Sequence, residues 1–353
     1  MITIAAAALA VALAAPVPGP TGWAVTGAPN SRILPFDVGQ LDEDKLLRSG
    51  RKAALYALAS GPDGYHRERP PLVLVHGIQG HPRDLQAVID RLKATRYQLY
   101  VFAYDDWKTR TSLSGNQLAD ELRNLTGYLG KGRDLTIVAH SMGGIVTRQA
   151  LNQLSYGARR GLERFRSAHV IAIDTPWHGY GGPGDRGIEG AFMAVARPFM
   201  PDALEDMRAR SAMFQGDPKS KDPVARVGLL QVVPPSNLTI DLAFAQEGKD
   251  IHDYTEAELV PYAQLLAGYF LRESKIGPDP MVINFHRALV QSSAWFPFQD
   301  AMRAQADRGS LEAAAVRAGL ERFFPRFPGD HTGVLREQSR KPTFLDWMMG
   351  KLR

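Results

Sequence analysis

Ser141 stands in the stretch LTIVAHSMGG, between an apolar run and two glycines. An apolar strand that ends in a small residue, Ser and Gly predicts a sharp strand-to-helix turn, which lifts the hydroxyl above the sheet. Ala139 and Gly143 are small enough to leave room for that backbone. The amides and the dipole at the start of the next helix favour negative charge there. The pattern predicts a nucleophile, and a buried serine that caps a helix is the alternative.

A second motif, VHGIQG, follows the apolar run LVLV. An oxyanion hole needs two backbone N–H groups that converge on one point, one from the residue after the nucleophile and one from the loop after an early strand. Met142 and Ile78 are the candidates, and Gln79 is a less favoured one. Gly77 is expected to allow close approach of the backbone, and His76 to support the loop through hydrogen bonds.

Short β-branched runs alternate with helical patterns from residue 71 onward, which predicts right-handed βαβ units and a mostly parallel sheet. The expected strands are at 72–75, 97–104, 135–139, 169–173 and 227–233, and the expected helices at 83–95, 117–129 and 143–154. The predicted fold class is α/β, with helices on both faces of the central sheet. Two stretches, near 180–222 and 254–325, are interpreted as helical cap or lid insertions over the carboxyl ends of the strands. Extra packing helices are an equal alternative for the second.

Four motifs, VLVHGIQG, YDDW, AHSMGGIV and DTPWHG, occur in this order. Together they resemble the α/β-hydrolase superfamily, in its lipase and serine-esterase branch, which includes proteins like GPI inositol-deacylase and triacylglycerol lipases. The resemblance covers residues 68–245 and 328–350. That family has T-P-H-x-G after the sixth strand, whereas this chain has Trp177 at the His position and His178 one residue later. A tryptophan that lines the pocket is expected there.

A serine hydroxyl needs a histidine within hydrogen-bond reach, oriented by a carboxylate. The resemblance implies the chain order Ser, acid, His, so the base should come late. His331 in FPGDHTGVLREQS is the candidate, because a Gly-Asp-His loop before the final amphipathic segment PTFLDWMMGKL resembles the end of family members. The other histidines after Ser141 are interpreted as structural or surface residues: His169, His178, His252 and His286.

Two residues are candidates for the carboxylate that orients the histidine. The resemblance implies an acid in the loop after the strand expected at 227–233, and Asp241 comes soonest there. Later carboxylates of the same loop are Glu247, Asp250 and Asp253. Asp174 is the alternative because it ends the strand HVIAID, where one lipase subgroup carries its acid; it could instead pin the TPWHG loop. Asp330 is interpreted as a residue that caps the loop of His331.

Composition excludes several classes of protein. The 353 residues are 44% apolar and 22% charged, which is typical of a globular α/β protein. A net charge of +5 without runs of like charge predicts no nucleic-acid partner. The chain has no cysteine and no metal-binding spacing such as H-E-x-x-H, so neither a metal nor another cofactor is expected.

The N-terminal segment 1–27 has an apolar stretch and a Pro-rich exit, and it is interpreted as a signal peptide. No Lys or Arg precedes the apolar stretch, so a disordered N-terminus is the alternative. Residues 28–67 are expected to form a leader segment and 68–353 the hydrolase domain. We therefore expect export to the medium, the periplasm or the cell envelope, or a cytoplasmic protein if 1–27 is not a signal.

These residues and the resemblance predict a serine hydrolase that cleaves a carboxylic ester through an acyl-enzyme on Ser141, with His331 as the base and Asp241, or alternatively Asp174, as the acid. An acyltransferase, an amidase and a non-catalytic binding protein of the same fold are the alternatives. The expected partner is a small-molecule or lipid ester. Apolar insertions favour a hydrophobic acyl group and transient contact with a lipid surface. The sequence indicates no oligomeric state.

Overall fold

The structure is a computed structural model of the chain. It describes residues 33–34, 53–58, 65–78, 80–157, 160–176, 202–208, 211–229, 237–245, 325–336 and 341–353. Several predictions fall outside these residues: the signal peptide at 1–27, the insertion at 254–325, much of the insertion at 180–222, and the roles of Gln79, Trp177, His178, Glu247, Asp250, Asp253, His252 and His286.

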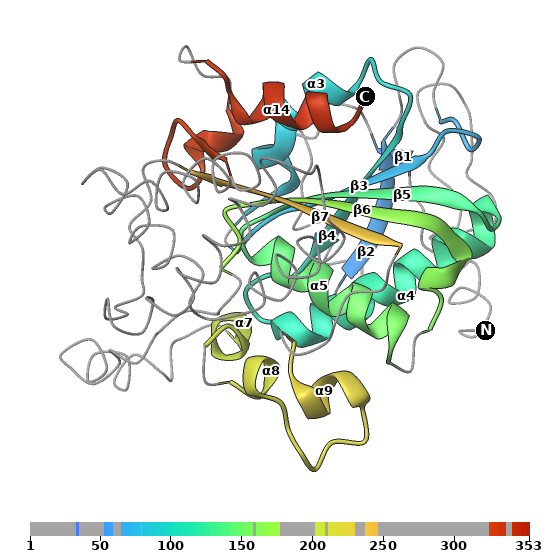
Figure 1. Ribbon diagram of the computed structural model, residues 1–353, viewed down its shortest axis with the longest axis vertical. Coiled ribbons are helices and arrows are strands. Elements are labelled where there is room, and N and C mark those ends of the chain that lie inside the picture. The colour runs from blue at the N-terminus through green and yellow to red at the C-terminus, as the bar shows by residue number, and fades with distance from the viewer. Residues whose placement is uncertain are drawn as a thin grey trace, which may run out of the picture.

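The described strands form one sheet in the order β1-β2-β4-β3-β5-β6-β7-β8 (Figure 1). Its neighbours from β4 through β8 pair in parallel, and β2 pairs antiparallel with β4. This mostly parallel sheet confirms the predicted fold class. The strands are β1 (Ile33–Leu34), β2 (Ala53–Leu58), β3 (Pro71–Val75), β4 (Gln98–Tyr104), β5 (Arg133–His140), β6 (Phe165–Ile173), β7 (Leu238–Ala245) and β8 (Arg326–Phe327).

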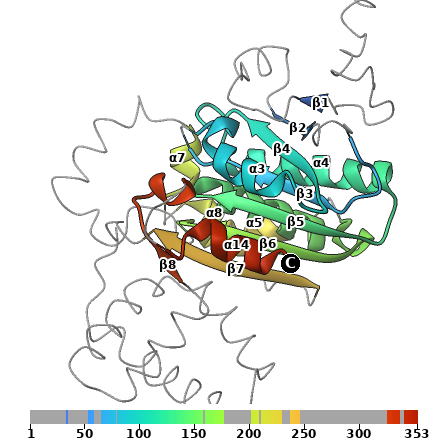
Figure 2. The same ribbon diagram turned by 90° about the horizontal axis from the view of Figure 1, so that it is seen from above.

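Helices cover both faces of the sheet. The helices α4 (Thr111–Leu129) and α5 (Met142–Ser155) lie on one face, and α3 (Gln86–Leu92) and α14 (Phe344–Lys351) lie on the other (Figures 1 and 2). The helices predicted at 83–95, 117–129 and 143–154 are present as α3, α4 and α5, and α4 begins earlier than its apolar pattern. Within the described residues, no helix combines the length and apolarity that a membrane span requires.

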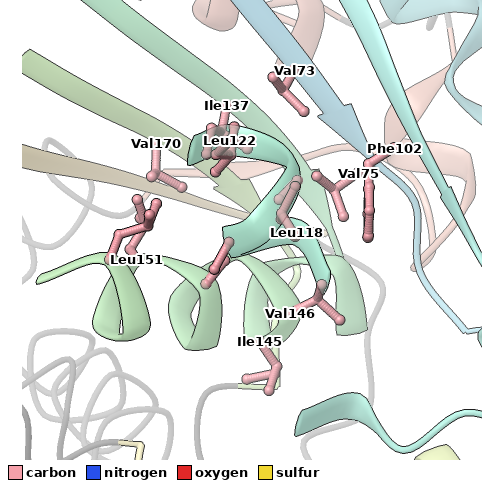
Figure 3. Packing of buried hydrophobic residues seen from close by; sticks show 14 of the residues in the cluster. Val73, Val75, Phe102, Leu118, Leu122, Ile137, Ile145, Val146, Leu151 and Val170 are labelled. Atoms are coloured by element: carbon pink, nitrogen blue, oxygen red, sulfur yellow. The ribbon is translucent and has the colours of Figure 1, made fainter. Parts of the chain in front are cut away.

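Alternation along the strands divides the core in two, because successive side chains of a strand point to opposite faces. Val73 and Val75 of β3 pack toward α4 and α5, whereas Leu72 and Leu74 belong to the cluster under α3 and α14. Figure 3 shows the first cluster, where Leu118 of α4 meets side chains of the sheet and of α5. A strand buried on both faces is apolar at nearly every position, which explains the unbroken apolar runs in the sequence.

Two predictions about the ends of the sheet were wrong. The strand expected at 227–233 does not begin where it was predicted, since Val227 ends the helix α9 (Pro223–Val227) and Leu229 is buried beside α5, where its carbonyl accepts from Asn152 Nδ2 at 3.1 Å. Residues 230–233 lie outside the described residues, and the next described strand is β7. A short apolar run is typical both of a buried strand and of a segment that packs under a helix, so periodicity alone could not distinguish the two. The boundary at residue 68 was also too late, because β2 already belongs to the sheet.

Part of the predicted insertion near 180–222 docks against the start of α4. The helix α7 (Asp202–Asp206) presents Asp206, whose Oδ2 accepts from the backbone N–H of Ser112 at 2.9 Å and from the Ser112 hydroxyl. Thr111 Oγ1 donates to the carbonyl of Ala203 at 3.0 Å. A carboxylate at this helix N-terminus satisfies an unpaired amide and interacts favourably with the helix dipole. The helix α8 (Ala212–Gln215) follows in the same segment.

Candidate active site

The candidate residues gather at the carboxyl edge of the sheet. The chain runs from β3 outward to β4 and returns to β5 on the other side of β3, so β3 and β5 flank the point where the strand order reverses. In open α/β sheets, loops that follow the strands on either side of such a point diverge and leave room for a ligand. The loop after β3 carries Ile78, and Ser141 comes directly after β5.

Ser141 occupies the strand-to-helix turn that its sequence predicted. Its backbone has φ +53° and ψ −130°, which is a strained conformation for a residue with a side chain. The two neighbours predicted to be small allow it: Ala139 is fully buried, and a Cβ on Gly143 would lie only 2.4 Å from the carbonyl oxygen of His76. Ser141 itself is 5% exposed. The turn therefore holds the hydroxyl in one place at the N-terminus of α5.

The structure brings Ser141, His331 and Asp174 together from three separate strand ends. Ser141 Oγ lies 2.8 Å from His331 Nε2, and the other ring nitrogen, Nδ1, contacts Asp174 Oδ2. Asp174 follows β6 with φ +51°, and its second oxygen accepts from the backbone N–H of Ala245 at 3.3 Å. A hydroxyl that donates to a histidine, which in turn donates to a carboxylate, is the arrangement that activates a serine for attack.

Asp241, the carboxylate preferred from the sequence, does not meet His331. It lies within β7 rather than in a loop after it, and its backbone pairs with Ile171 instead of reaching the carboxyl edge. Its oxygens accept from Lys351 Nζ and from His169 Nε2, each at 2.7 Å. Burial alone would raise the pKa of Asp241, but these two partners lower it below its usual value. The preference for Asp241 was wrong because the expected strand was placed too early in the chain. Asp241 ties α14 to the sheet.

The loop after β3 is packed against the nucleophile. A Cβ on Gly77 would lie 2.8 Å from Ser141 Cβ, so only glycine fits there, as expected. His76 is buried and stacks on Tyr104, whose hydroxyl donates to the carbonyl of His76 at 2.7 Å. His76 Nδ1 lies 2.9 Å from the carbonyl of Gly77, and burial lowers the pKa of the His76 ring to about 4. His76 therefore supports the loop as a neutral ring, which agrees with its predicted role.

Asp106 fixes the far end of the same loop. Its Oδ2 accepts from the backbone N–H of Gly80 at 3.0 Å, and Gly80 N–H also reaches the carbonyl of Gly77 at 3.2 Å. Burial raises the pKa of Asp106 to about 6, against the lowering effect of that hydrogen bond. Asp330 caps the turn that contains His331, as predicted, since its Oδ1 accepts from the N–H of Gly333 at 2.6 Å.

Three residues at the site were not assigned a role from the sequence: Tyr104, Asp106 and His140. Tyr104 and Asp106 belong to YDDW and its preceding strand, and His140 is a variable position of the serine motif. Their positions beside recognised motifs were the only indication of a role. Their partners lie far away in sequence, so no local pattern could reveal the contacts. The described residues also contain no group of three or more His, Asp or Glu side chains that could hold a metal ion.

Comparisons with known proteins are consistent with this geometry. Residues 70–219 match the family described as "Putative serine esterase (DUF676)". That segment includes Ser141 and Asp174 and ends before His331. No curated protein matches the chain.

Solved structures with similarity to the chain include lipases and esterases. The lipase BlEst2 of Bacillus licheniformis is 17% identical in its mature form, with 61% of this chain and 79% of that one covered and a TM-score of 0.36. Its propeptide form is 21% identical over 42% of this chain, with a TM-score of 0.31, and this chain spans 31% of its length. A carboxylesterase structure from Nitrososphaera gargenis is 14% identical, covers 85% of this chain and 93% of its own, and has a TM-score of 0.36.

The sheet order, the strained serine turn after β5 and the matched family agree with one another. The described sheet and helices have the α/β-hydrolase fold, and residues 70–219 are similar to a putative serine esterase family.

Proposed function

We propose that the protein hydrolyses a carboxylic ester through a covalent acyl-enzyme on Ser141. The observation that carries the proposal is the continuous contact from Ser141 Oγ to His331 Nε2, and from His331 Nδ1 to Asp174. A serine that only caps a helix uses its oxygen as an acceptor and needs neither a histidine nor a carboxylate beside it.

In the proposed reaction, Ser141 Oγ attacks the ester carbonyl carbon while its proton moves to His331 Nε2. Asp174 holds His331 with Nδ1 protonated and stabilises the positive charge that forms on the ring. The tetrahedral intermediate collapses, the C–O bond to the leaving group breaks, and His331 returns the proton to the departing alcohol. Water then attacks the acyl-enzyme, with His331 again as the base, and releases the acid and the free serine.

The proposed oxyanion hole consists of the backbone N–H groups of Met142 and Ile78. Met142 is the first residue of α5, and the first amides of a helix have no partner within the helix. Ile78 follows Gly77, which packs directly on Ser141. Both N–H groups therefore start from backbone next to the nucleophile, where they would stabilise the negative oxygen of the intermediate.

A fluorophosphonate probe tests the proposal, because it phosphonylates only a serine that is activated by its neighbours. We expect the folded wild-type protein to be labelled and Ser141→Ala to remain unlabelled with an unchanged Tm. Folded wild-type protein that resists the probe would favour a non-catalytic binding protein. A panel of p-nitrophenyl esters of increasing acyl length, run beside matching amides and with an added alcohol acceptor, separates an esterase from an amidase and an acyltransferase.

A further inference from the structure

His140, the last residue of β5, takes no part in the hydrogen bonds that join Ser141, His331 and Asp174. Its Nε2 lies 2.7 Å from the backbone carbonyl oxygen of His331, which is 191 positions later in the chain. A carbonyl oxygen can only accept, so Nε2 carries the proton and donates it. The two imidazole rings lie 4.7 Å apart between their centroids. His140 thus holds the backbone of the residue whose ring contacts the nucleophile.

The ring of His140 is neutral at neutral pH. Burial and, to a smaller extent, the neighbouring ring of His331 lower its pKa to about 4. With the proton on Nε2, Nδ1 is bare, and a Cβ on Gly77 would lie 3.3 Å from that atom. One buried ring therefore lies between the loop of His331 and the loop proposed to form the oxyanion hole.

Beyond the contacts of its ring, the loop of His331 is held by Val334 and Leu335, which are buried in the core cluster under α3 and α14. Asp330 shapes the turn internally, through Gly333 N–H at 2.6 Å and Thr332 N–H at 3.2 Å. Those bonds fix the form of the turn, but they do not fix its distance from β5. The strand that precedes the loop, β8, has only two residues. The bond from His140 joins the loop backbone directly to the strand that carries Ser141.

We propose that His140 is a positioning residue: its Nε2–H anchors the carbonyl of His331 to the end of β5 and so sets the distance between His331 Nε2 and Ser141 Oγ. The inference rests on the proposed esterase chemistry, because it assigns His140 a part in activating that serine. His140 and Ser141 are consecutive, so any displacement of the strand end moves the nucleophile and the anchor of the base together. A neutral ring also adds no positive charge beside the imidazolium that forms on His331 during attack.

The test compares His140→Gln with His140→Met. The two side chains are equal in length, but only glutamine can donate a hydrogen bond to the carbonyl of His331. We expect His140→Met to lower both the rate of fluorophosphonate labelling and kcat by about tenfold, with KM unchanged, which is the size expected for one lost hydrogen bond. His140→Gln should stay within about threefold of the wild type, by the same reasoning.

His169→Gln is the matched control. This histidine lies on the neighbouring strand β6 and contacts Asp241, away from the nucleophile. We expect it to change Tm while the labelling rate stays at the wild-type value. If His140→Met does not fold, as judged by circular dichroism, His140→Phe replaces it as a ring without a donor.

The outcomes separate this inference from the proposed function. A wild-type protein that is not labelled would contradict the proposed function itself. If the wild type is labelled and Ser141→Ala is not, a folded His140→Met that reacts at the wild-type rate overturns the inference. It is equally overturned if His140→Gln is as slow as His140→Met, because the loss would then come from packing rather than from the donor.

Discussion

Replacement of Asp174 by Asn tests which carboxylate completes the site. Asn is the appropriate change because it tolerates the left-handed backbone found at Asp174, with φ +51°, better than most residues do. Its carbonyl can still accept from Ala245 N–H, now at 3.3 Å. Asn carries no negative charge that would attract the His331 ring, and its NH2 group cannot accept a hydrogen bond. A primary amide that turns its NH2 toward Nδ1 selects the tautomer with the proton on Nε2, which cannot accept from Ser141.

The expected loss can be worked from the contact. A carboxylate and an imidazolium about 4 Å apart interact by about 4 kcal/mol at an effective dielectric constant of ~20, which corresponds to about 10³-fold in rate. The side chain of His331 is 48% exposed, so solvent screens part of this attraction. The wrong tautomer adds to the loss, and the same substitution in a serine protease costs about 10⁴-fold. We therefore expect kcat to fall by about 10² to 10⁴-fold in Asp174→Asn.

Asp241→Asn is the matched control, since it makes the same chemical change in the other candidate. It weakens the contacts with His169 and Lys351, so we expect a lower Tm with kcat within about twofold of the wild type. Steady-state hydrolysis of a p-nitrophenyl ester by the two variants, with Tm measured for both, decides the matter. A variant Asp174→Asn that keeps its activity while Asp241→Asn loses it would refute the assignment.

Two further predictions concern the loop after β3 and the serine turn. Gly143→Ala should lower the free energy of unfolding by at least about 2 kcal/mol, because its Cβ would lie 2.4 Å from a backbone carbonyl oxygen. The control is Gly127→Ala on α4, where a Cβ meets no atom within 4 Å. It should stabilise the protein in the same urea titration. A destabilised Gly127→Ala beside an unaffected Gly143→Ala would contradict this. For Asp106, the folded pKa of about 6 exceeds the ordinary 3.8, so its contribution to stability is full below pH 4 and is lost as pH rises through 6. Asp106→Asn should therefore gain on the wild type by up to about 3 kcal/mol above pH 6 and lose that advantage near pH 4, and a difference independent of pH would rule the explanation out.

The sequence by itself determined the features that depend on neighbouring residues. The turn at Ser141 needs an apolar strand, small flanking residues and a helix, and all of these lie within one short stretch. The unbroken apolar runs and the helical periodicities likewise predicted the α/β fold and the alternation of strands and helices from β3 to β6, because burial on both faces leaves a local record. The loop of His331 was recognised from its resemblance to family members rather than from periodicity.

Tertiary structure alone decided which carboxylate faces His331. Asp174 and Asp241 both follow or occupy apolar strands, and only the pairing of β6 with β7 places one at the carboxyl edge and the other in the middle of the sheet. The hydrogen bond from His140 to the loop of His331 joins residues 191 positions apart. Such contacts depend on the register of strands and on loop paths through space, and local preferences of the chain carry no information about either.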